Sequence, residues 1–163
     1  MKRLAVAFTG PSNSGKTTLI EKISKKLNQD GFKVAIIKHD PKDKARFDTE
    51  GKDSYRFTQT KADVAVISPK KTTLFKNSTS DIDEVIRLFG DFDYLLVEGL
   101  KTIPLPRICI QRDQINQDYF DVSDVVATDG TIPKEQFPDT IKLLDLNDLQ
   151  QILLWIDNNA KVV

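Results

Sequence analysis

Eight consecutive residues near the N-terminus, Gly10 to Thr17, have the types and spacing of a loop that binds phosphate groups. They read Gly-Pro-Ser-Asn-Ser-Gly-Lys-Thr and match the pattern G-x-x-x-x-G-K-[ST] in full. Glycine lets the backbone curl so that several N–H groups point at phosphate oxygens, and a Cβ at Gly15 would intrude on that curl. Lys16 is expected to reach the β- and γ-phosphates, and the Thr17 hydroxyl to bind Mg²⁺. We therefore predict nucleotide contacts from Gly10, Pro11, Ser12, Asn13, Ser14, Gly15, Lys16, Thr17 and Thr18.

Acidic residues at strand ends are candidates for the other side of the magnesium site, because such loops need a second acid there. Glu98 ends the apolar run Leu95-Leu96-Val97 and is predicted to hold magnesium through water or to position an attacking water. An exposed acid at a strand end is the alternative for Glu98. Lys38 and Asp40 follow the second strand, and we predict that both contact nucleotide and that Asp40 also contacts the metal. Lys16 and Glu98 are the candidate catalytic residues.

Base recognition has a weaker signal in the sequence. The Asn-Lys-x-Asp signature of many guanine-binding loops is absent. Asp129 follows a late strand, where a carboxylate can accept hydrogen bonds from guanine N1–H and N2–H₂. A turn built on Asp129-Gly130 is an equally good interpretation.

Strand and helix patterns alternate along the chain, and most of the strands are apolar throughout. Such strands belong in sheets covered on both faces, and their alternation with helices is typical of a doubly wound α/β domain. We predict a P-loop NTPase fold, with a mostly parallel sheet and helices on both faces, in a single domain of residues 1–163. Strands are expected at residues 4–9, 34–37, 64–67, 72–75, 94–97, 107–110, 125–127 and 141–144, with the first two buried and the third and fourth paired antiparallel.

Helices are predicted where apolar residues recur at helical spacing, around residues 19–27, 82–89 and 149–156, and a short helix is expected near 55–57. Side chains that cap helix N-termini precede three of them. Ser80 or Asp81 is expected to cap the helix at 82–89, and Asn147 the last helix. Asp53 or Ser54 is expected to cap the short one.

Charge and cysteine counts exclude several classes of protein. Lys plus Arg and Asp plus Glu both number 24, so no net field attracts nucleic acid or an acidic membrane. No run approaches the roughly 20 apolar residues of a membrane span, and the N-terminus lacks a signal-peptide pattern, so we predict a cytoplasmic protein. Cys109 is the single cysteine and is expected to be buried; His39 is the single histidine, too few for a zinc site of His and Cys.

Several segments, in order along most of the chain, resemble the MobB family of molybdopterin-guanine dinucleotide biosynthesis adapter proteins. The resemblance rests on Lys38-His39-Asp40, on Asp48-Thr49-Glu50-Gly51-Lys52-Asp53-Ser54, on Leu96-Val97-Glu98-Gly99-Leu100-Lys101 and on Leu143-Leu144-Asp145-Leu146-Asn147-Asp148. Members often carry a second histidine just after Lys-His, where this chain has Asp40-Pro41. Many also have Ala-Gly-Ala where this chain has Lys61-Ala62-Asp63.

The resemblance implies a GTP-binding protein, dimeric, with weak GTPase activity, and the phosphate loop adds Mg²⁺ as its metal. It implies a supporting role in attaching a GMP moiety to molybdenum cofactor, with a MobA-type guanylyltransferase as partner and molybdoenzymes as clients.

Two other functions are compatible with the phosphate loop. A small-molecule kinase would need arginines that clamp the transferred phosphoryl group, and the six arginines here are scattered, with Arg46 and Arg56 flanking the polar loop at 40–53. A non-catalytic module whose loop at 40–53 orders on nucleotide would share the same motif.

Overall fold

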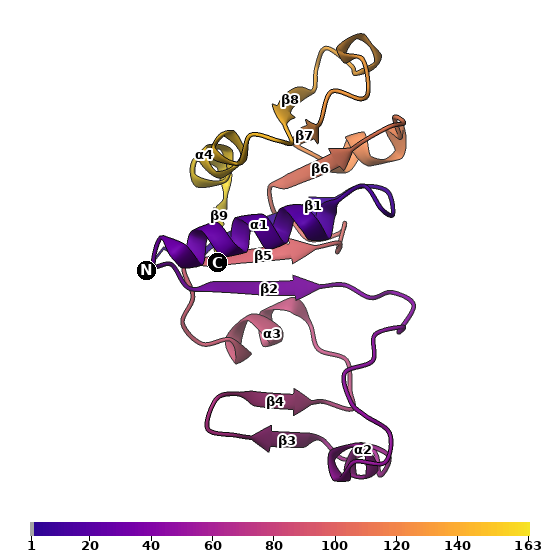
Figure 1. The fold of residues 1–163 in the computed structure, drawn as a ribbon, viewed down its shortest axis with the longest axis vertical. Coiled ribbons are helices and arrows are strands. Elements are labelled where there is room, and N and C mark those ends of the chain that lie inside the picture. The colour runs from indigo at the N-terminus through magenta and orange to yellow at the C-terminus, as the bar shows by residue number, and fades with distance from the viewer. Residues whose placement is uncertain (1) are drawn as a thin grey trace. The chain divides into compact units, whose positions relative to one another are not determined.

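Four strands with almost entirely buried side chains form the centre of the sheet in the computed structural model, which describes residues 2–163. They are β1 (Leu4–Thr9), β5 (Tyr94–Glu98), β6 (Arg107–Gln111) and β7 (Val125–Thr128). With β2 (Val34–Lys38) and β8 (Lys142–Asp145) they form a parallel sheet in the order β2-β5-β1-β6-β7-β8 (Figure 1). The short β9 (Lys161–Val162), which the sequence analysis missed, pairs antiparallel with β1. The predicted mostly parallel α/β sheet is confirmed.

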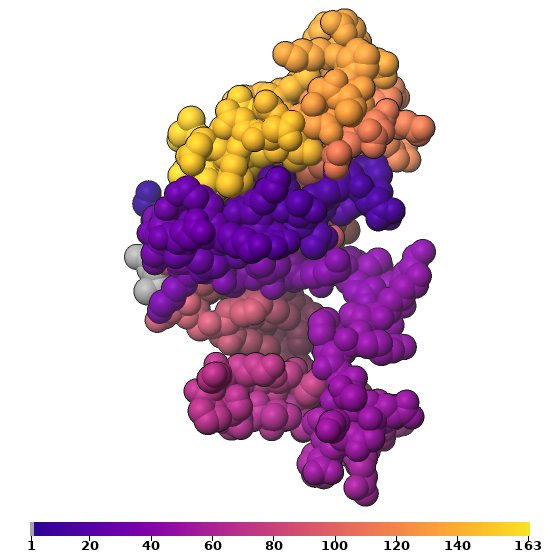
Figure 2. All heavy atoms as spheres, in the orientation of Figure 1, coloured from indigo at the N-terminus to yellow at the C-terminus, as the bar shows by residue number. Residues whose placement is uncertain are grey.

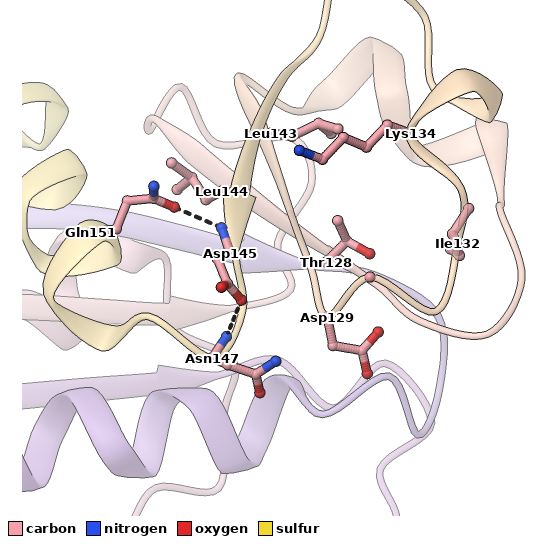
Figure 3. A pocket seen from close by; sticks show the side chains of 10 residues that line it. Thr128, Asp129, Ile132, Lys134, Leu143, Leu144, Asp145, Asn147 and Gln151 are labelled. Carbon is pink, nitrogen blue, oxygen red and sulfur yellow. Dashed lines mark hydrogen bonds between the residues drawn. The ribbon is translucent and has the colours of Figure 1, made fainter.

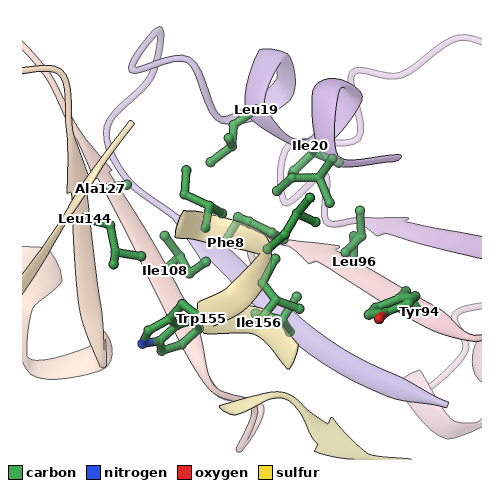
Figure 4. Close-up of a cluster of buried hydrophobic side chains, with 14 of the residues drawn as sticks. Phe8, Leu19, Ile20, Tyr94, Leu96, Ile108, Ala127, Leu144, Trp155 and Ile156 are labelled. Atoms are coloured by element: carbon green, nitrogen blue, oxygen red, sulfur yellow. The ribbon is translucent and has the colours of Figure 1, made fainter. Parts of the chain in front are cut away.

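One face of this sheet is covered by α1 (Lys16–Gln29) and α4 (Leu149–Asn159), whose surfaces adjoin in Figure 2. Phe8 and Ile108 point from the sheet into the same cluster, shown in Figure 4. Each helix buries the apolar stripe that a period of 3.6 residues produces: Leu19, Ile20, Ile23 and Leu27 in α1, and Ile152, Leu153, Trp155 and Ile156 in α4.

The opposite face of β6 and β7 carries a second, smaller cluster. Cys109 and Val126 alternate with residues of the first cluster along their strands, and they pack with Phe137. The cover on this side consists of loops with two 3₁₀ segments, η1 (Gln117–Val122) and η2 (Lys134–Gln136). Cys109 is fully buried in this cluster, which confirms the prediction of burial, and the burial raises the pKa of its thiol.

The chain divides into two compact units. One comprises the chain up to His39 together with Asp91–Val163, and contains the whole parallel sheet. The other is Asp40–Gly90, with α2 (Asp53–Thr58), α3 (Ile82–Leu88) and an antiparallel hairpin of β3 (Val64–Ile67) and β4 (Thr72–Phe75). The hairpin confirms the antiparallel pair expected from the sequence. That residues 1–163 act as a single domain stays a prediction.

Three helix starts test the capping predictions. The Asp81 carboxylate accepts from the Glu84 N–H at 2.8 Å, which confirms the cap of α3. Asn147 does not cap α4: its own N–H is held by Asp145 in the preceding turn, and Asp148 accepts from the Gln151 N–H instead.

The capping prediction for α2 is also wrong, because α2 begins after Lys52 with no side-chain cap. The Ser54 hydroxyl donates to Asp48 at 2.9 Å instead, which closes the loop ahead of the helix.

The prediction of a buried second strand is wrong for β2. This strand lies at the end of the sheet order and pairs with β5 alone, so only Ala35 is buried and Ile36 is 42% exposed. Within residues 2–163, the helices are all too short or too polar to cross a bilayer.

Candidate nucleotide-binding site

The loop Gly10–Gly15 joins β1 to α1 at the carboxyl edge of the parallel sheet. β1 pairs with β5 and β5 with β2, so Phe8, Glu98 and Lys38 lie in one row across the three strands. In open α/β sheets this edge, beside a change of winding direction, is where ligands bind. The sheet order thus brings together residues from three distant parts of the chain.

Two glycines give the loop a path that other residues would obstruct. Gly10 has φ +139°, and a Cβ added there would lie 2.4 Å from the Ile110 carbonyl oxygen, so the loop passes directly over β6. Gly15 has φ +96° in the left-handed region and precedes the first residue of α1. Because backbone N–H groups at this turn point out of the helix start, the segment can cradle an anion.

Ser14 also lies inside the loop. It is 6% exposed, and its Oγ has no hydrogen-bond partner among residues 2–163. A buried hydroxyl without a partner is uncommon in folded proteins and suits a site that takes a polar ligand. Ser14 therefore supports the interpretation of this loop as a phosphate cradle.

Lys16 lies across the opening of the loop. Its Nζ donates to the carbonyl oxygens of Gly10 at 2.9 Å and Pro11 at 2.6 Å. Burial lowers the pKa of this ammonium from the ordinary 10.5, and Lys38 acts in the same direction, whereas Glu98 opposes it. A partly desolvated ammonium attracts an anion more strongly than one in water does.

Glu98 links the two sides of the site. One carboxylate oxygen lies 3.5 Å from the Thr17 hydroxyl and the other 3.5 Å from the Lys38 ammonium. The Glu98 side chain is 14% exposed, against 62% for Lys38. These three side chains line a hollow of about 480 Å³ together with Ser12, Asn13, Gly15, Lys16, Thr18 and Arg112. A hydroxyl and a carboxylate side by side are the oxygen donors that Mg²⁺ prefers.

Asp129 lies in a second hollow, of about 240 Å³, which shares Gly15, Thr18 and Arg112 with the first. Its Oδ1 accepts from the Thr131 N–H and hydroxyl, and its Oδ2 from Arg112 Nε at 2.7 Å. The Thr131 bond lowers the pKa of this carboxyl, and Arg112 contributes, so Asp129 is an acceptor at neutral pH.

A third hollow, of about 300 Å³, continues from Asp129 along the ends of β7 and β8 (Figure 3). Asp129 and Asn147 belong to both the second and the third hollow. Thr128 lines the third, and its buried Oγ1 has no partner among residues 2–163. Polar groups therefore follow the carboxyl edge from the phosphate loop to β8.

Asp40 belongs to the other compact unit, Asp40–Gly90. Its carboxylate accepts from the backbone N–H groups of Lys44 at 2.6 Å and Ala45 at 2.7 Å, and so shapes the start of its own loop. The nucleotide and magnesium roles of Asp40 stay predictions. The same holds for the roles of the loop residues, Lys38, Glu98 and Asp129, although these lie together at one sheet edge.

Two arginines at the site were missed in the sequence, where the arginines look scattered. Arg112 follows β6 and lies against the loop, 3.6 Å from where a Cβ on Gly15 would be. Arg107 is 1% exposed, and its guanidinium donates to the carbonyl oxygens of Gly99, Leu100 and Ile103 behind Glu98. The only signal in the sequence was the placement of both at the ends of one apolar strand.

Comparison with protein families gives one match that covers most of the chain. Residues 5–129 match the model of the family MobB, described as "Molybdopterin guanine dinucleotide synthesis protein B".

Two curated relatives and one solved structure agree with that match. The molybdopterin-guanine dinucleotide biosynthesis adapter protein of Haemophilus influenzae is 30% identical over 158 residues, covering 94% of this chain and 87% of that protein. The putative adapter protein of Methanocaldococcus jannaschii is 31% identical over 122 residues, 71% of this chain, but the match spans only 50% of that longer protein. The crystal structure of Bacillus subtilis MobB has a TM-score of 0.76 and 25% identity, with 96% and 98% of the two chains covered.

Proposed function

This chain belongs to the MobB family, and from that membership and its phosphate loop we propose that it is a GTP-binding adapter protein in molybdopterin guanine dinucleotide biosynthesis. The observation that carries the proposal is the hollow in which Lys16, Thr17 and Glu98 meet at the carboxyl edge of the sheet. A full P-loop with a carboxylate from the neighbouring strand is built for a nucleoside triphosphate and its metal.

Each residue of the loop has a distinct part in this proposal. Backbone N–H groups of Asn13 to Thr18 surround the β-phosphate, and the α1 N-terminus adds its dipole. Lys16 exchanges its bonds to Gly10 and Pro11 for bonds to β- and γ-phosphate oxygens. Thr17 and Glu98 are the residues suited to hold Mg²⁺, which would neutralise charge on the β- and γ-phosphates.

We propose that hydrolysis at this site is slow. Glu98 orients a water and accepts its proton as the water oxygen bonds to the γ-phosphorus and the bond from that phosphorus to the β–γ bridging oxygen breaks, releasing GDP and phosphate. The Lys38 ammonium lies 3.5 Å from the same carboxylate and competes for it. A carboxylate that shares its charge with a lysine is a poor proton acceptor, so turnover is weak.

Guanine recognition is proposed for Asp129 in the second hollow. The hollow begins at Gly15 and Thr18 and ends at the loops after β7 and β8, which suits a nucleoside whose phosphates occupy the loop. Leu146 and Leu19 supply apolar contact to a flat ring there. With Oδ1 taken by two bonds from Thr131 and Oδ2 by one from Arg112, Asp129 Oδ2 keeps one acceptor site for the N1–H of guanine, whereas adenine N1 carries no proton to donate.

Partners and assembly are part of the proposal. The names of the relatives support a place in molybdopterin guanine dinucleotide biosynthesis. We propose a MobA-type guanylyltransferase as the partner and molybdoenzymes as clients, in the cytoplasm. A homodimer is supported by the hairpin of Asp40–Gly90, which exposes Ile67 and Leu74 on one face, since Leu74 pairs with Ala65, two residues before Ile67. A two-stranded hairpin with an exposed apolar face is marginal alone and gains from a partner surface.

Calorimetric titration tests the proposal. Wild-type protein is expected to bind GTP in the presence of Mg²⁺, and Lys16→Ala to lose that binding while keeping its fold by circular dichroism. Lys25→Ala, an exposed lysine on the same helix that lines neither hollow, serves as the matched control and keeps most of the affinity. ATP binding as tight as GTP binding would contradict the guanine part, and no binding of either nucleotide would contradict the whole.

Family membership does not favour the small-molecule kinase alternative. Arg46 and Arg56, the arginines that kept this alternative open, are both exposed and lie in Asp40–Gly90. A nucleotide-dependent interaction module without turnover differs from the proposed adapter only in its rate of GTP hydrolysis. Phosphate release measured over hours, with Glu98→Gln as the blank, separates the two.

A further inference from the structure

Arg112 is the charged residue that the two hollows beside the phosphate loop have in common. It lines the larger hollow with Lys16 and the smaller one with Asp129, and its side chain lies along Gly15. Any nucleotide that extends from the loop into the second hollow passes this guanidinium. Its position is therefore between a phosphate subsite and a base subsite.

The Arg112 guanidinium is used on one side only. Its Nε donates to Asp129 Oδ2 at 2.7 Å, and within residues 2–163 neither Nη makes a hydrogen bond. The side chain is 43% exposed and lines both hollows, so a ligand there can reach these N–H groups. A planar fork with one edge held by a carboxylate presents its other donors in a fixed direction, which suits a phosphate oxygen.

Asp129 itself is held in place by the loop after β7. Thr131 donates to its Oδ1 through the backbone at 3.1 Å and through the hydroxyl at 2.6 Å. The same Thr131 hydroxyl accepts from the Asp113 N–H at 2.8 Å. These hydrogen bonds connect the loop after β6 to the loop after β7. They hold the backbone beside Arg112 through Asp113 and the Arg112 guanidinium through Asp129.

We propose that Arg112 and Asp129 act as one unit, in which Asp129 holds the Arg112 guanidinium so that it binds a phosphate oxygen of the nucleotide. The inference rests on the proposed nucleotide function. It adds Arg112 as the residue through which the base subsite and the phosphate subsite affect each other. Arg112 contacts the phosphate, and Asp129 is a positioning residue for it as well as a contact for the base. Occupation of the two subsites is then coupled through one ion pair.

Inorganic triphosphate with Mg²⁺ isolates the phosphate subsite, because this probe has no base. The sign of the Asp129 effect then decides between two roles. If Asp129 acts only as a nearby negative charge, its removal reduces repulsion and tightens triphosphate binding. If Asp129 positions Arg112, its removal frees the guanidinium and weakens triphosphate binding despite the loss of repulsion.

Isothermal titration of triphosphate into four proteins tests this: wild type, Asp129→Ala, Arg112→Ala and the double variant. We expect Asp129→Ala to weaken binding about 3- to 10-fold, as loss of an oriented charge-assisted hydrogen bond does. In the Arg112→Ala background the same substitution is expected to leave binding unchanged or tighter. Asp129→Asn keeps the shape of the side chain and is expected to act in the same direction if the alanine variant folds poorly.

Asp139→Ala is the matched control, because Asp139 is an exposed acid that makes no hydrogen bond within residues 2–163. It is expected to leave triphosphate binding within about 1.5-fold of wild type, since Asp139 lines neither hollow and an exposed charge is screened by salt. Wild type that binds GTP, with Asp129→Ala unchanged or tighter for triphosphate, would overturn this inference alone. Wild type that binds neither GTP nor triphosphate would overturn the proposed function and the inference with it.

Discussion

The Thr17 hydroxyl lies 3.5 Å from the Glu98 carboxylate, although 81 positions separate the two residues in the chain. The parallel pairing of β1 with β5 produces this proximity, since Phe8 stands opposite Glu98 in the register. The helix that begins at Lys16 then turns Thr17 toward the same edge. Two oxygen donors are therefore held by rigid elements, which is the arrangement a metal site needs.

Glu98→Gln is expected to lower the affinity of the GTP-bound protein for Mg²⁺. The amide has a similar shape but no negative charge, so the attraction for the metal and its water falls. We expect the apparent Mg²⁺ affinity, measured by titrating the metal at fixed GTP, to drop about 10-fold or more, as for other residues that orient metal ligands. Glu135→Gln, on the exposed η2 segment, is the control. Equal Mg²⁺ affinity in Glu98→Gln and wild type would argue against a metal-side role for Glu98.

Gly10→Ala is expected to lower the free energy of unfolding more than Gly31→Ala does. The added Cβ would lie 2.4 Å from the Ile110 carbonyl oxygen, whereas nothing lies within 4 Å of a Cβ on Gly31. Both glycines have positive φ, and the +139° of Gly10 lies further from the left-handed region than the +89° of Gly31, so backbone strain adds to the steric clash at Gly10. Urea unfolding is expected to show a loss of about 1 kcal/mol for Gly31→Ala and at least about 2 kcal/mol for Gly10→Ala. Similar losses in the two variants would mean that the loop can move off β6.

Arg107→Met is expected to loosen the segment that follows Glu98. The buried guanidinium donates to Gly99, Leu100 and Ile103 carbonyl oxygens, and Leu100 has a left-handed φ of +49° that these bonds help to hold. Loss of the donors from a buried site is expected to lower the free energy of unfolding by about 3 kcal/mol.

If Arg107 positions Glu98 through the segment that follows it, the loss of Arg107 also weakens Mg²⁺-dependent GTP binding. In Arg107→Met, at temperatures where the variant is folded, Mg²⁺-dependent GTP binding is expected to fall. Arg87→Met on α3 is the control, because Arg87 is exposed and makes no side-chain hydrogen bond within residues 2–163. A destabilised Arg107→Met that binds Mg²⁺ and GTP normally would limit Arg107 to a structural role.

Local spacing in the sequence was sufficient to predict the elements around the site. The loop pattern, the strand before it and the stripe of α1 are contiguous, and the apolar run that ends in Glu98 indicates a central strand. The buried state of Cys109 followed from its apolar neighbours in the same way. These features depend on neighbours a few residues away, where periodicity is informative.

Long-range order in the sheet was not predictable from spacing. Arg112 lies beside Gly15 only because β6 pairs with β1, and nothing in its own segment indicates that neighbour. The exposure of β2 has the same origin, since an apolar strand does not show whether it lies at the edge of a sheet. The misplaced cap of α4 has a local cause, because Asn147 and Asp148 both suit the position and differ by one residue.

The Asp129 carboxyl is expected to contribute to stability in a pH-dependent way. Hydrogen bonds from Thr131, and from Arg112 beside it, hold its pKa below the ordinary 3.8. A depressed pKa means that the folded state favours the ionised form, so the stabilisation is complete above pH 3.8 and is lost as the pH falls through the folded value. The difference in unfolding free energy between wild type and Asp129→Asn, from urea titrations, is therefore expected to shrink on acidification below pH 3.8. A difference that stays constant would mean that the bonds from Thr131 do not depend on the charge of Asp129.

The hairpin of Asp40–Gly90 gives a test of the proposed homodimer. Ile67 is 80% exposed at the end of β3, and Val66 and Leu74 expose apolar surface on the same hairpin. A lysine at Ile67 would place a charge in any interface formed there, and burying an unpaired charge is strongly unfavourable. Sedimentation velocity is expected to show a dimer for wild type and a monomer for Ile67→Lys at the same concentration.

Leu154→Lys changes an apolar residue of α4 that is 62% exposed, and it is expected to leave the dimer intact because Leu154 lies outside the hairpin. If both lysine variants stay dimeric, the proposed interface is not on the hairpin, and if wild type is monomeric, the homodimer proposal itself is wrong.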